Sequence, residues 1–66
     1  MNRELKGFMA KFDIHYDNLA EVLNLSVNTI GKKIRNETFD QKEIKQLVDY
    51  FQRYDREADF SIFFKK

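Results

Sequence analysis

Apolar residues recur along this chain at the spacing of helix faces. The first stripe stands at i, i+3, i+4 and i+7 and consists of Leu5, Phe8, Met9 and Phe12. It predicts a helix over residues 3–12, with Asn2 as its N-cap, because this spacing puts all four side chains on one face. A second stripe with the same spacing consists of Ile44, Leu47, Val48 and Phe51. It predicts a helix over residues 41–54.

Two shorter helices are predicted between these stripes, over residues 16–23 and 27–35. Their inward-facing residues are Leu19, Ala20, Leu23, Ile30 and Ile34. Ala20 is small and lies in the middle of the earlier helix. A small residue suits the point where two helices joined by a short turn cross at a steep angle.

Polar residues mark where these helices start and stop. Asn24 tolerates the left-handed backbone conformation that a tight turn requires. Ser26 has the chemistry of an N-cap for the helix that follows. Asp40 and Glu43 have the spacing of a capping box, which predicts the start of the last long helix.

The end of the chain carries an ambiguous pattern. The alternating apolar positions are Ala58, Phe60, Ile62 and Phe64. Alternation is typical of a strand, but the same residues fit one short helical turn equally well. Both alternatives stay open.

Composition narrows the class of protein. Sixty-six residues, of which 42% are hydrophobic and 35% charged, indicate a single all-α domain over residues 1–66. The absence of Cys excludes disulfides and cysteine-bound zinc, so we expect no metal or cofactor. No nucleophile–base pair or phosphate-binding loop is present, so we expect no enzyme. Apolar runs of three residues are too short for a membrane span or signal peptide, which predicts a cytoplasmic protein.

Charge is distributed unevenly along the chain. The net charge is only +1, but residues 22–36 contain Lys32, Lys33 and Arg35 and no acid. Residues 13–21 contain three acids and neither Lys nor Arg. A phosphate backbone responds to such a local basic element rather than to the net charge.

The stretch 16–30, YDNLAEVLNLSVNTI, resembles the helix-turn-helix of the Cro and repressor proteins of phages, which runs x-x-x-L-A-x-x-L-G-V-S-x-x-T-I. The continuation 32–39, KKIRNETF, is similar to small members of that family that read K-K-I-x-N before a Phe. Asn24 replaces the usual turn Gly, and His15 stands where the family has a Thr cap, which leaves Asp13 or a shifted helix start as alternatives. The resemblance implies a lambda-repressor-like domain of four to five helices. The helix-turn-helix would span about 16–35, followed by a short aromatic tail.

The resemblance also implies a function. The chain would be a sequence-specific transcriptional regulator, binding double-stranded DNA in the major groove through the helix at 27–35. If it is phage-encoded, it would act in a bacterial host cell. The implied base contacts are Val27, Asn28 and Lys32, with Gly31 allowing close approach. The implied phosphate contacts are Tyr16, Lys33, Arg35, Asn36 and Thr38.

Several of these residues have plainer interpretations. Val27 would simply complete the core edge, Gly31 would be merely tolerated, and Tyr16 would be packing. Lys32 and Lys33 would then belong to an ordinary solvated face.

The aromatic tail supports a second hypothesis. Its surplus apolar residues, together with two tyrosines of the last long helix, form a possible homodimer surface made of Tyr50, Tyr54, Phe60, Ile62, Phe63 and Phe64. Alternatively, the tail only completes the monomer core, in part against the first helix. A protein-interaction module of the same fold, which binds and modulates a repressor or another protein, is the competing function.

Overall fold

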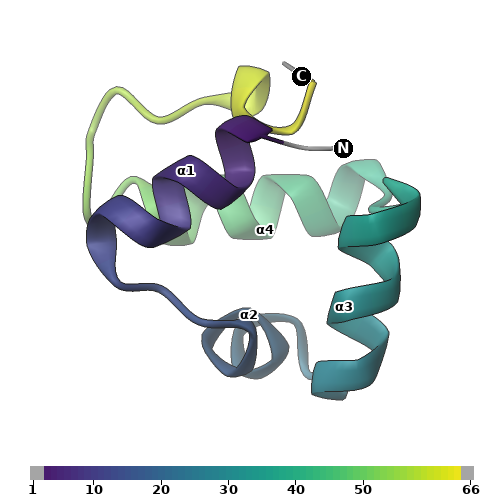
Figure 1. The fold of residues 1–66 in the computed structure, drawn as a ribbon. Helices are drawn as coiled ribbons and strands as arrows, with labels where there is room; N and C mark the ends of the chain where they lie inside the picture. The colour runs from purple at the N-terminus through teal and green to yellow at the C-terminus, as the bar shows by residue number, and fades with distance from the viewer. Residues whose placement is uncertain (1–2, 65–66) are drawn as a thin grey trace.

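The computed structural model describes residues 3–64, and within this range the regular structure is entirely helical (Figure 1). Its elements are α1 (Arg3–Phe12), α2 (Tyr16–Leu23), α3 (Val27–Asn36), α4 (Gln41–Phe51) and the short 3-10 helix η1 (Phe60–Phe63). The all-α prediction is confirmed. Of the two alternatives for the tail, the short helical turn is confirmed, because residues 60–63 form η1 and not a strand. The cap predicted at Asn2 lies outside the described residues.

The turn between α2 and α3 has the backbone conformation that its sequence predicts. Asn24 is left-handed, with φ 57° and ψ 45°. The N–H of Leu25 then donates to the carbonyl of Ala20 at 2.9 Å and closes the end of α2. Ser26 caps α3, because its Oγ accepts the N–H of Thr29 at 3.1 Å. The direction of α3 relative to α2 is therefore set by local hydrogen bonds.

α2 starts at Tyr16, as predicted, although its N-cap is His15 and not the Thr of the Cro-type pattern. His15 is the N-cap residue, and its backbone N–H donates to Oδ1 of Asn18 at 2.8 Å. The imidazole Nε2 lies 3.0 Å from Oδ1 of Asp13, and both side chains are exposed. Asp13 itself is left-handed, with φ 58°. Asn18 thus supplies the bond that fixes the first turn of α2.

The last long helix ends earlier than predicted. The N–H of Gln52 still donates to the carbonyl of Val48 at 2.9 Å, but the next two bonds are of the tighter i to i−3 kind. They join Arg53 to Tyr50 at 3.1 Å and Tyr54 to Phe51 at 2.9 Å. The regular helix therefore stops at Phe51, and the prediction of residue 54 is wrong by one turn.

The core gathers side chains from all four helices. The fully buried ones are Leu5, Leu19, Ile30, Ile34, Leu47 and Phe51. In Figure 1, α2 is seen nearly end-on and α3 rises along one side. α1 meets α4 through the rings of Phe8 and Phe51, whose centroids lie 4.8 Å apart. α2 packs against α3 and α4, whereas η1 packs against α1 and α4. Among residues 3–64, no helix lies over the outer face of α3.

The tail belongs partly to this core. Phe63 stacks on Phe51, with ring centroids 6.1 Å apart, and meets Phe39 edge-on at 5.8 Å. Ile62 is buried as well, and the amide of Gln52 donates to the carbonyl of Ala58 at 2.9 Å. The assignment of Ile62 and Phe63 to a self-association surface is therefore wrong. Packing of the tail against the first helix is confirmed.

Candidate nucleic-acid interface

The outer face of α3 carries a contiguous stripe at i, i+1, i+4, i+5 and i+8. Its residues are Val27, Asn28, Gly31, Lys32 and Arg35. All except the glycine are exposed, whereas Ile30 and Ile34 on the opposite side are buried. Val27 is 47% exposed, so it does not complete the core edge. The stripe presents a methyl-bearing side chain, an amide, an ammonium and a guanidinium to solvent.

Gly31 is buried although it lies on this outer face. A Cβ built on it would lie 3.8 Å from Cε2 of Tyr16 and 3.8 Å from Nη1 of Arg35. Tyr16, at the start of α2, is half-buried and packs against the core. These two side chains cover the glycine. The close approach of DNA expected at Gly31 would therefore require both of them to move.

Lys33 points away from the stripe and is engaged inside the molecule. Its Nζ lies 3.1 Å from Oε1 of Glu43, and the two side chains are only 23% and 17% exposed. For Lys33 to contact a phosphate as expected, its ion pair with Glu43 would have to break. Lys32 and Arg35 are thus the cations of α3 that have no acid within ion-pair distance among residues 3–64. Sequence reasoning missed this pairing, because Glu43 belongs to the next helix.

Asn36 and Thr38 are exposed at the far end of α3. Glu37 lies between them as the C-cap, in the left-handed conformation with φ 53°. The backbone N–H of Thr38 donates to the carbonyl of Lys33 at 3.0 Å, so only its hydroxyl can face a phosphate. An exposed carboxylate at Glu37 lowers the positive potential at this end of α3.

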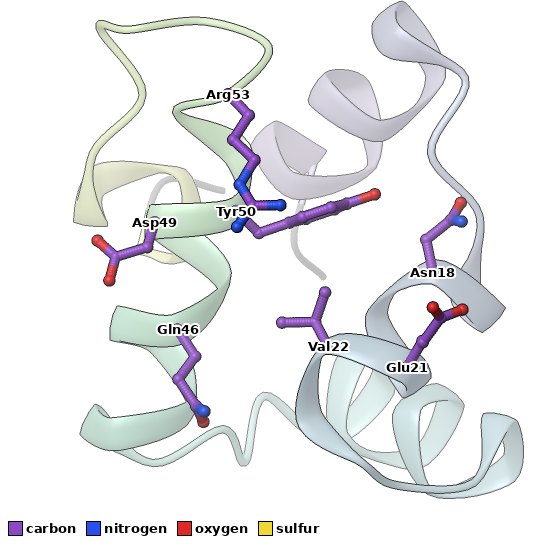
Figure 2. Close-up of a pocket in the computed structure, with 7 residues that line it drawn as sticks. All are labelled: Asn18, Glu21, Val22, Gln46, Asp49, Tyr50 and Arg53. Carbon is purple, nitrogen blue, oxygen red and sulfur yellow. The ribbon is translucent and has the colours of Figure 1, made fainter.

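A separate groove of about 450 Å³ lies between α2 and α4 (Figure 2). Its lining residues are Asn18, Glu21, Val22, Gln46, Asp49, Tyr50 and Arg53. Figure 2 shows the ring of Tyr50 extending from α4 toward the α2 side. Carboxylates and a guanidinium face the same space, so the groove has mixed charge. It is separate from the α3 stripe, because no α3 residue lines it.

The hydroxyls of Tyr50 and Tyr54 lie 3.0 Å apart beside this groove. Burial, followed by this hydrogen bond, raises the pKa of Tyr50 to about 12. Tyr50 therefore stays neutral at physiological pH. Among residues 3–64, no three His, Asp or Glu side chains gather in a way that would hold a metal ion.

The remaining apolar surface lies around the N-terminal half of α4. Phe60 and Phe64 are 51% and 68% exposed, and they border a hollow of about 380 Å³ beside Ile44. The residues of the expected self-association surface that are not buried therefore fall into two patches. Phe60 and Phe64 lie beside the start of α4, and Tyr50 and Tyr54 lie near its end. Within residues 3–64, no helix is long and apolar enough to cross a membrane.

The structure brings Asn28, Lys32 and Arg35 together on one exposed face, with Tyr16 beside them at the α2–α3 junction. No family model matches this chain, and neither a curated protein nor a solved structure matches it. The functional interpretation therefore depends on the chemistry of this face.

Proposed function

We propose that the chain is a sequence-specific DNA-binding transcriptional regulator of the lambda-repressor-like type, with α2 and α3 as its helix-turn-helix. One observation carries the proposal: the outer face of α3 has no other helix over it among residues 3–64, and its exposed stripe holds Asn28, Lys32 and Arg35. An amide pairs with adenine, and basic side chains pair with the guanine acceptors in the major groove. The Cro-type pattern of residues 16–39 supports the same assignment.

The dimensions of α3 suit this role. An α-helix with its side chains is about 10–12 Å across, and the major groove is about 12 Å wide. Ten residues make a helix roughly 15 Å long, which spans about four base-pair steps. Val27, Asn28 and Lys32 would face the base edges, with Val27 placed for a thymine methyl. Regulation would come through protein concentration or a partner.

The phosphate contacts would flank this stripe. Tyr16 lies at the start of α2, while Asn36 and Thr38 lie at the far end of α3. Contacts beside the middle of the stripe and at the C-terminal end of α3 would set the register of the helix on the duplex. Lys33 contributes less than its charge suggests, because Glu43 already neutralises it.

An amide NMR titration with a short duplex DNA tests the proposal. At low salt we expect shifts concentrated at Tyr16, at residues 26–32 and at residues 35–38. They should disappear at high salt, because counterion release drives the contact. No shift at residues 26–32 would overturn the proposal.

Substitution of Lys32 makes the test residue-specific. Lys32→Ala should weaken binding to the preferred duplex by about 1–3 kcal/mol. Lys42→Ala is the matched control, because Lys42 is an exposed lysine on α4, outside the stripe. If Lys32→Ala and wild type bind this duplex with equal affinity, Lys32 is not part of the interface.

A protein-interaction module is the second candidate function. The exposed rings of Phe60 and Phe64 favour it, because apolar patches of this kind commonly bind a second protein. The partner would be a second copy of this chain or a repressor protein. Two variants distinguish the functions. Phe64→Ser should impair activity in a protein-interaction module and leave DNA binding unchanged, whereas Lys32→Ala should weaken DNA binding and leave a protein-interaction module unchanged.

A further inference from the structure

The guanidinium of Arg35 does not lie at the end of α3, where its position in the chain would place it. Long side chains on a helix point back toward the N-terminus and cover the preceding turn. Nη1 of Arg35 accordingly lies 3.8 Å from the point that a Cβ of Gly31 would occupy. The charge is therefore at the level of residue 31, in the middle of the exposed stripe.

The ring of Tyr16 approaches the same point of the stripe. Its Cε2 is also 3.8 Å from the Cβ position of Gly31, and the burial of this glycine shows that the outer face is covered there. An aromatic ring is a favourable neighbour for a guanidinium, which is planar and weakly hydrated. A methyl at residue 31 would make only ordinary contacts with both groups, so their placement does not depend on the glycine.

We propose that Arg35 reads a guanine, and that Tyr16 holds its guanidinium in the reading position, an inference that rests on the proposed DNA-binding function. The fork of a guanidinium matches the N7 and O6 acceptors of guanine in the major groove. Asn28 and Lys32 lie within one helical turn of Gly31, so the three polar residues share one exposed face of α3. This role replaces the phosphate contact expected for Arg35.

Selection of duplexes from a random library tests the assignment. Wild type should enrich a site that contains a guanine for which Arg35→Ala loses its preference. Arg35→Gln should shift the same position toward adenine, because a side-chain amide pairs with that base. Arg56→Ala is the matched control, since Arg56 is an exposed arginine outside the helices, and it should enrich the wild-type site.

A chemical change in the DNA isolates the contact. Replacing the selected guanine by 7-deazaguanine removes the N7 acceptor. Wild type should then bind more weakly, and loss of the whole bidentate pair corresponds to about 5- to 150-fold. Arg35→Ala should be insensitive to the replacement, because it has already lost the contact.

The role of Tyr16 as a positioning residue has its own measurements. In the free protein, we expect NOEs between the Tyr16 ring and the Arg35 side chain, which report the arrangement without DNA. Tyr16→Phe should keep the guanine preference, because the ring remains. Tyr16→Ala should lose the preference at that base pair, in addition to the uniform loss of affinity from its phosphate contact, whereas a role limited to structure or phosphate contact would leave the guanine preference intact.

The outcomes distinguish this inference from the function on which it rests. If Arg35→Ala keeps the guanine preference and its salt slope falls by about one, Arg35 contacts a phosphate and only this inference is overturned. If wild type enriches no sequence, both are overturned. Circular dichroism checks each fold, and Arg35→Gln carries the test if Arg35→Ala does not fold.

Discussion

Lys33 Nζ lies 3.1 Å from Oε1 of Glu43, and this contact joins α3 to the start of α4. The same oxygen accepts the backbone N–H of Asp40 at 3.1 Å. Oδ1 of Asp40 in turn accepts the N–H of Glu43 at 2.8 Å. One carboxylate therefore closes the capping box of α4 and neutralises a lysine of α3. Because both partners are mostly shielded from water, salt screens the pair less than it screens a surface pair.

Removing the charge of Lys33 should affect stability rather than DNA binding. Lys33→Met keeps the alkyl stem, and we expect the free energy of unfolding to fall by about 1 kcal/mol, because the Glu43 carboxylate loses one of its two donors. Urea denaturation measures this change. The salt slope of duplex binding should stay at the wild-type value, because the charge is already paired. A slope reduced by about one would show instead that Lys33 contacts a phosphate.

Replacing the buried glycine of α3 should stabilise the protein. Gly31→Ala should raise the free energy of unfolding by up to about 1 kcal/mol, because alanine favours a helix interior and the new methyl makes only ordinary contacts at 3.8 Å. Gly7→Ala in α1 is the control, since its Cβ would meet nothing within 4 Å. A gain at Gly7 with a loss at Gly31 would show that the space between Tyr16 and Arg35 admits no methyl group. Thermal unfolding compares the two variants.

The turn and the helix cap between α2 and α3 were predictable from the sequence, whereas side-chain contacts between helices were not. Asn24 and Ser26 act on neighbours within four or five residues, so their roles follow from residue type and spacing. The Lys33–Glu43 pair and the cover over Gly31 join different helices and depend on how those helices pack. The helix stripes are predictable for the same local reason, because apolar spacing alone defines a face.

The tail shows why alternation alone cannot assign a surface. In a helix with about three residues per turn, positions 60 and 63 eclipse each other, yet Phe60 is exposed and Phe63 is buried between Phe51 and Phe39. Periodicity therefore does not separate them. Their burial depends on where η1 packs against α1 and α4, which follows from the path of residues 52–59. For the candidate site, the sequence identified α3 as the element. It did not indicate which cations of α3 remain unpaired.

Substitutions in the tail should separate folding from association. Phe63→Ala should lower the free energy of unfolding by about 3–5 kcal/mol, because a buried ring leaves a cavity. Phe64→Ser should change it by less than about 0.5 kcal/mol, because Phe64 is 68% exposed. If the hollow beside Ile44 is a self-association surface, sedimentation should show a dimer for wild type and a monomer for Phe64→Ser. If wild type stays monomeric at high protein concentration, the chain does not bind itself through this hollow, and a different protein would be its partner there.

The Tyr50–Tyr54 pair predicts how stability changes in alkali. In the folded protein the pKa of Tyr50 is about 12, raised from 10.0 mainly by burial and then by the hydrogen bond to Tyr54. Between these values the folded state binds more protons than the unfolded state, so the free energy of unfolding falls as the pH rises through this window. The full contribution is present below about pH 10. Tyr50→Phe should remove this part of the pH dependence.

Tyr54→Phe should lower the pKa of Tyr50 only partway toward 10.0, because burial is the larger cause and remains. Titration of tyrosinate absorbance in the folded protein measures the pKa, and urea denaturation across the same window measures the stability. If Tyr50→Phe loses stability with rising pH as steeply as wild type does, the alkaline transition belongs to other groups, and the two hydroxyls form no lasting bond in solution.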